Sequence, residues 1–136
     1  MANYGLYKNI NPSSITSAVS SLKSQLSPTK QQLTEIKIGL TDGVWKVNAK
    51  ATFFTALDKI NSEVYKEIDD NLNNLSEIAT LIGEYKTAET NANTMKNNIS
   101  NATEKTPQST INGWRQSLAN YERTMTEKEA SIKAKL

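Results

Sequence analysis

Apolar side chains recur at steps of four and three residues along most of the chain, the spacing that places them on one face of a helix. The first run begins at Ile15 and ends at Leu40, and Thr29 is its one polar position. Pro28 falls inside this run, where a proline removes a backbone hydrogen bond and bends or breaks a helix. Because the apolar phase continues across Pro28, the pattern predicts one bent helix over residues 15–40 rather than two.

A second run follows after a predicted turn at residues 41–45, where Gly43 and Trp45 stand. From Phe53 to Leu75 its steps average about 3.67 residues, close to an undistorted helix. Smaller apolar residues then carry the run on to Ala102, and no proline interrupts it. The pattern therefore predicts one long helix over residues 45–103, with Trp45 as a core aromatic that closes the turn.

A third run starts after a loop at residues 106–110 and predicts a helix over 111–136. Each of the two outer helices is about half as long as the middle one, so both can pack antiparallel on it. We therefore expect an all-α fold: an elongated antiparallel helical hairpin with a long second helix and a third C-terminal helix packing back. The whole of 1–136 reads as one helical domain, with an N-terminal arm at 1–12, the hairpin at 13–103 and the extension at 104–136.

Two layers of helices bury each apolar face on one side only, so the fold favours a helical partner chain. The partner could be a second copy, another small hairpin protein or the N-terminal helical region of a toxin. We expect Leu22, Ile60, Val64 and Leu75 in particular to stay partly accessible. The full set of candidate interface residues is Leu22, Leu26, Leu33, Phe53, Leu57, Ile60, Val64, Leu75, Trp114 and Tyr121.

Composition narrows the function further, because the chain has neither cysteine nor histidine. The commonest general base, the thiolate nucleophile and the usual ligands of zinc are therefore missing, and we expect no enzyme, no cofactor and no metal site. A net charge of +2 and only two arginines argue against nucleic-acid binding. No apolar run resembles a signal peptide or a membrane-spanning helix, so we expect no stable membrane insertion.

One family combines a helix, a turn with tryptophan at its exit and an aromatic-plus-acid pair about forty residues later. Here these are the helix ending at Leu40, the turn at Trp45, and Tyr85 with Glu89. The chain resembles the small Trp-x-Gly helical-hairpin proteins of the type VII secretion pathway. It differs in having Val47 where that family has glycine, and its third helix is similar to longer relatives that accompany LXG-type toxins of Gram-positive bacteria.

The resemblance implies a non-catalytic protein that dimerises through its helices and serves as a substrate or export partner of a co-secreted toxin. It also implies export without a cleaved signal, so that the protein is cytoplasmic first and then secreted or on the cell surface. Tyr85 and Glu89 lie one helical turn apart and would form the signal read by a secretion ATPase. That reading requires Tyr85 to be at least partly accessible. Two alternatives stay open: an intracellular coiled-coil scaffold or phage-type structural protein, and a membrane-active helical protein.

Overall fold

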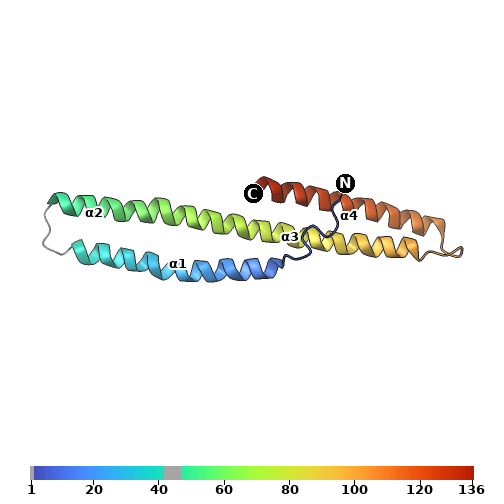
Figure 1. Ribbon diagram of the computed structural model, residues 1–136, viewed down its shortest axis with the longest axis horizontal. Helices are drawn as coiled ribbons and strands as arrows, with labels where there is room; N and C mark the ends of the chain where they lie inside the picture. The colour runs from blue at the N-terminus through green and yellow to red at the C-terminus, as the bar shows by residue number, and fades with distance from the viewer. Residues whose placement is uncertain (1, 42–46) are drawn as a thin grey trace. The chain divides into compact units, whose positions relative to one another are not determined.

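A computed structural model describes the backbone of residues 2–41 and 47–136 and the side chains of residues 2–36 and 52–136. The helices are α1 (Pro12–Thr41), α2 (Val47–Lys59), α3 (Tyr65–Ser100) and α4 (Gln108–Lys135). A π-helical turn, η1 (Ile60–Val64), joins α2 directly to α3. The described residues contain no strand, so the all-α prediction is confirmed (Figure 1). The predicted turn with Gly43 and Trp45 lies outside the described residues.

The helices follow the predicted pattern closely, with one exception. Helix α1 continues through Pro28 without interruption, so the predicted first helix is not split. The predicted long helix is a single helical run from Val47 to Ser100. The π-turn within it was not predicted. A π-turn contains an extra residue, and it therefore rotates the apolar face of everything that follows.

The chain forms two compact units. The hairpin unit is Ser14–Ser76 and the terminal unit is Met1–Ser13 together with Glu77–Leu136. The backbone passes between them twice, once at the start of α1 and once within α3. The residues before α1 are thus grouped with the C-terminal helix, far from them in sequence.

Each unit is built on one antiparallel pair of helices. In the hairpin unit, Lys23 of α1 contacts Asn73 of α3, and Lys30 contacts Asp69. In the terminal unit, Lys128 of α4 pairs with Glu84 of α3, and Lys135 pairs with Glu77. In both pairs the residue numbers rise on one helix as they fall on the other. The C-terminal helix therefore packs back on α3, as the sequence predicts.

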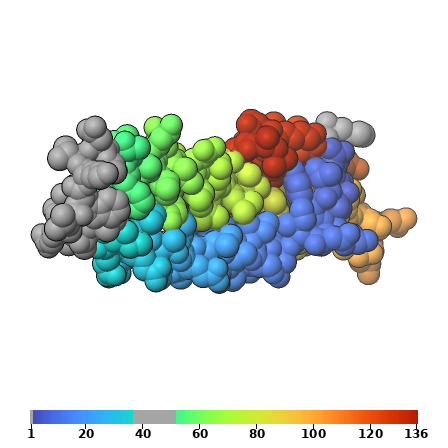
Figure 2. All heavy atoms as spheres, turned by 60° about the vertical axis from the view of Figure 1, so that its left-hand side comes forward, coloured from blue at the N-terminus to red at the C-terminus, as the bar shows by residue number. Residues whose placement is uncertain are grey.

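The terminal unit has an additional layer, the arm (residues 2–11), which is a series of turns rather than a helix. Gly5 adopts a φ of 73°, a left-handed conformation that glycine reaches without steric cost. Figure 2 shows the arm, in dark blue, against the red C-terminal part of α4. Ala2, Tyr4 and Tyr7 pack there on a buried cluster formed by Tyr85, Ala88, Ala92 and Met125.

Candidate functional site

The π-turn decides which residues of the hairpin unit are buried. The predicted apolar face continues through Ile60, Val64 and Ile68, but these side chains are 38%, 47% and 37% exposed. Tyr65, which lies off the predicted face, is buried instead, alongside Leu57 and Leu72 of that face. The extra residue of the π-turn turns the later part of the helix by about 100°, so Tyr65 takes the inner position that Val64 was expected to hold. The apolar face after residue 60 is thus displaced toward one edge of the pair.

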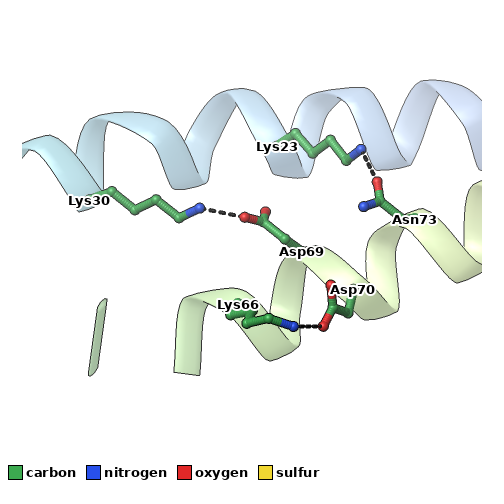
Figure 3. Close-up of polar contacts among 6 residues, drawn as sticks. All are labelled: Lys23, Lys30, Lys66, Asp69, Asp70 and Asn73. Atoms are coloured by element: carbon green, nitrogen blue, oxygen red, sulfur yellow. Dashed lines mark hydrogen bonds and ion pairs between the residues drawn. The ribbon is translucent and has the colours of Figure 1, made fainter. Parts of the chain in front are cut away.

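The opposite edge of the helix pair is polar and bridged by lysines. Lys30 Nζ lies 2.5 Å from Asp69 Oδ2, and Lys23 Nζ donates to Asn73 Oδ1 at 2.5 Å. Figure 3 shows both lysines extending from α1 to α3. Lys30 Nζ also lies 5.7 Å from the centre of the Tyr65 ring, a distance that allows a cation–π contact. These contacts join the two helices along this edge.

The other edge, which we call the apolar edge, is open. Lys23 directly follows Leu22 in the sequence, and Asp69 directly follows Ile68. Successive residues of a helix point about 100° apart. Leu22 therefore points about 100° away from Lys23 around α1, and Ile68 points about 100° away from Asp69 around α3. A shallow groove runs here between the helices. Its lining consists of Leu22, Gln25, Leu26, Thr29, Ile68 and Leu72.

Large apolar side chains extend the apolar edge beyond the groove. On α3, Leu75 lies about two turns after Ile68 and is 38% exposed. On α1, Leu22 and Ile36 are 48% and 47% exposed. Large apolar side chains exposed at several positions of a helix pair are typical of an interaction site.

The ten candidate interface residues differ in how far their side chains are exposed. Those exposed in the hairpin unit are Leu22, Phe53, Ile60, Val64 and Leu75, in keeping with the expected accessibility of four of them. Leu26 and Leu33 of α1 are half-buried, and Leu57 is buried. In the terminal unit, Trp114 and Tyr121 are half-buried, and Tyr121 packs against the Tyr85 cluster.

Tyr85 is fully buried, so the expectation that it is partly accessible is wrong for this conformation. Its ring meets that of Tyr7 edge-on, with centroids 4.9 Å apart. Its hydroxyl donates a hydrogen bond to the backbone carbonyl of Asn3. Tyr85 is buried because the arm packs on α3, and the helical pattern does not indicate that position of the arm.

The arm is held on α3 and α4 by three carboxylates. Asn3 Nδ2 lies 2.9 Å from both carboxylate oxygens of Glu129. The Tyr4 hydroxyl donates to Glu122 Oε1 at 2.6 Å. The backbone N–H of Gly5 donates to Glu89, the acid of the proposed signal pair. Both members of that pair are thus engaged by the arm.

Two lysines complete the attachment of the arm. Lys96 Nζ lies 3.4 Å from the centre of the Tyr4 ring, in cation–π geometry. Lys86 Nζ donates to the carbonyl oxygen of Ile10 at 2.7 Å, which fastens the far end of the arm. All of these contacts join residues more than seventy positions apart, so they depend on the folded terminal unit.

The electrostatics under the arm favour neutral tyrosines and an ionised Glu129. Burial, followed by the nearby charges of Glu89 and Glu129, raises the pKa of Tyr85 to about 12. Burial and the hydrogen bond to Glu122 raise the pKa of Tyr4. The hydrogen bond from Lys133, with a smaller contribution from Asn3, lowers the pKa of Glu129. Each polar group is therefore held in the form that its hydrogen bond requires.

One feature of the sequence does indicate this network, although the helical pattern alone does not. Met125 and Ile132 are seven residues apart and both buried, and the position between them on the same face is Glu129. A carboxylate at a core-facing position is rarely left without a hydrogen-bonding partner, so it predicts polar atoms packed opposite. Tyr65 had no comparable signal, because its burial depends on the π-turn.

Within the described residues, no three metal-ligating side chains gather at one place. No described helix has the length and apolar character needed to span a bilayer. Comparisons with models of protein families, with curated proteins and with solved structures give no significant match. The apolar edge of the hairpin unit and the arm-covered Tyr85–Glu89 pair are therefore the two candidate sites.

Proposed function

We propose that the chain is a non-catalytic helical partner protein of a type VII secretion pathway. Its apolar edge binds the helical region of a co-secreted protein, such as a toxin, and Tyr85 with Glu89 forms the export signal. The observation that carries the proposal is the apolar edge, where Leu22, Ile68 and Leu75 are all more than a third exposed. An amphipathic helix laid along this edge would cover these side chains and fill the groove.

The arrangement of the two edges supports a helical occupant. The lysine contacts to Asp69 and Asn73 join α1 to α3 on the other edge, and the groove is formed by the chain alone. A preformed groove reduces the entropy that a partner loses on binding. The exposed apolar residues recur at helical spacing on both helices, as the facing residues of a helix bundle do.

The proposal is tested with the N-terminal helical region of a protein encoded beside this chain as the probe. The two are co-expressed, and the mass of the complex is measured by light scattering. We expect a stable complex with the unchanged chain and none with Leu22→Glu, Ile68→Glu. The matched control for the change on α1 is Ser24→Glu, which places the same single charge as Leu22→Glu on an exposed part of α1 about 200° away from Leu22.

Three outcomes contradict the partner proposal. The first is a complex that survives the double substitution, and the second is its loss with Ser24→Glu as well. The third is a chain that stays monomeric and binds no neighbouring helical protein. A homodimer that the double substitution dissociates would instead identify a second copy as the occupant.

The export signal needs milder substitutions than alanine, because Tyr85 is part of the core. Tyr85→Phe with Glu89→Gln keeps the ring and the shape of the acid and removes one hydroxyl and one charge. We expect this variant to keep its helix content and its partner but to lose export from a Gram-positive host that carries the pathway. Normal export would place the signal elsewhere, and an intracellular scaffold, which would use the same apolar edge, would not be exported in any form.

A further inference from the structure

The arm covers the Tyr85–Glu89 pair without being part of any helix. It fills a slot between α3 and α4, where Tyr4 and Tyr7 supply the apolar contacts. Its polar contacts reach Glu89 on α3 and Glu122 on α4, so one short segment bridges both helices of the terminal unit. With the arm in place, the Tyr85 ring is closed off from any partner.

Several attachments of the arm lie at the protein surface. The bond from Gly5 to Glu89 and the bond from Lys86 to Ile10 are both exposed to solvent. Water can replace such bonds at low cost, and segments held by them open locally while the helices beneath stay folded. The helices α3 and α4 keep their own contacts, including the ion pair between Glu84 and Lys128, which does not involve the arm.

The arm is also directly connected to the candidate binding surface. It ends at Asn11, and α1 of the hairpin pair begins at Pro12. Leu22 of the apolar edge lies on that same helix, about three turns further on. A partner that binds along α1 therefore contacts the helix that directly follows the arm in the chain.

We propose that the arm is a displaceable latch over Tyr85 and Glu89, and that recognition of this pair requires the open state. In the closed state Asn3 and Gly5 occupy the hydrogen-bonding capacity of the Tyr85 hydroxyl and of Glu89. In the open state the Tyr85 hydroxyl and the Glu89 carboxylate lose these two partners and become free to bond to another molecule. The purpose of the latch rests on the proposed function. The measurements that detect the latch do not depend on that function.

The first measurement is native-state hydrogen exchange on the full chain. A latch predicts that the Gly5 amide exchanges at least about tenfold faster than the α3 amides around Tyr85, because the arm opens while the helix stays intact. Equal exchange of the two would mean that the arm opens only when the terminal unit unfolds, and it would overturn the proposal.

The second measurement is nitration of tyrosine by tetranitromethane, located by mass spectrometry of peptides. Tyr4→Phe with Asn3→Ala removes the bonds to Glu122 and Glu129, and we expect Tyr85 to be nitrated at least about tenfold faster in this variant. The matched control is Leu6→Ala, an arm residue that is 44% exposed, and it should leave the rate unchanged. Circular dichroism verifies that the helices persist, and Tyr4→Phe alone serves as the milder variant if they do not.

The outcomes separate the latch from the export signal. Unchanged nitration of Tyr85 in both arm variants overturns the latch, whatever export does. Faster nitration together with normal export of Tyr85→Phe, Glu89→Gln supports the latch and rejects the signal. Faster nitration and faster export of the arm variant support both.

Discussion

The hairpin unit and the terminal unit are both antiparallel helix pairs, yet they bury their side chains to different depths. The terminal unit encloses Tyr85, Met125 and Ile132 almost completely. In the hairpin unit Val19 is 3% exposed, but Leu57, Tyr65 and Leu72 keep 8–9% exposure, and large apolar residues remain open along one edge. Around Tyr85 and Met125 the difference is the arm, which adds a third layer to one pair only. A short irregular segment is thus enough to turn a two-helix surface into a closed core.

The largest expected effect comes from removing the aromatic side chain beneath the arm. Tyr85→Ala should lower the free energy of unfolding by about 3–5 kcal/mol, because it leaves a cavity where a large ring was fully buried. Leu22→Ala, at a site that is 48% exposed, should cost less than about 1 kcal/mol. Urea unfolding followed by circular dichroism measures both. Similar losses at the two sites would abolish the distinction between the units.

Alkaline pH should weaken the terminal unit through the same tyrosine. The pKa of Tyr85 rises from 10.0 to about 12 on folding, so the unfolded chain releases this proton first as the pH increases. The stabilisation is complete below pH 10 and is lost between pH 10 and 12, by up to about 3 kcal/mol. Thermal unfolding of the unchanged chain and of Tyr85→Phe across this range isolates the contribution. A difference between them that does not change with pH would contradict the assignment.

Within the hairpin unit, we expect replacement of the proline inside α1 to be stabilising. Pro28→Ala restores a backbone donor in the middle of the helix, and the gain should be about 1–2 kcal/mol after the greater freedom of the unfolded chain is subtracted. The matched control is Pro12→Ala, because Pro12 is the first residue of α1 and tolerates a missing donor. If both substitutions have the same effect, Pro28 does not strain the helix.

The sequence predicts the helices well because their apolar spacing is a local property. It predicts Pro28 within a continuous α1 because the apolar phase is unbroken there. It does not predict the burial of Tyr65, because the π-turn at Ile60–Val64 changes the phase without a proline or glycine to mark it. Nor does it predict the closure over Tyr85, which depends on contacts between segments at opposite ends of the sequence.

Sequence separation also sets the order in which the parts can form during synthesis. The bridge from Lys30 to Asp69 spans 39 positions, whereas the bond from Asn3 to Glu129 spans 126. Close-range contacts form first, and long loops slow the distant ones. The hairpin, with its apolar edge already exposed, therefore emerges from the ribosome before α4 exists to receive the arm. Tyr4 and Tyr7 stay without their binding site until α4 has been made, so a partner of the proposed kind would meet the apolar edge before the arm closes.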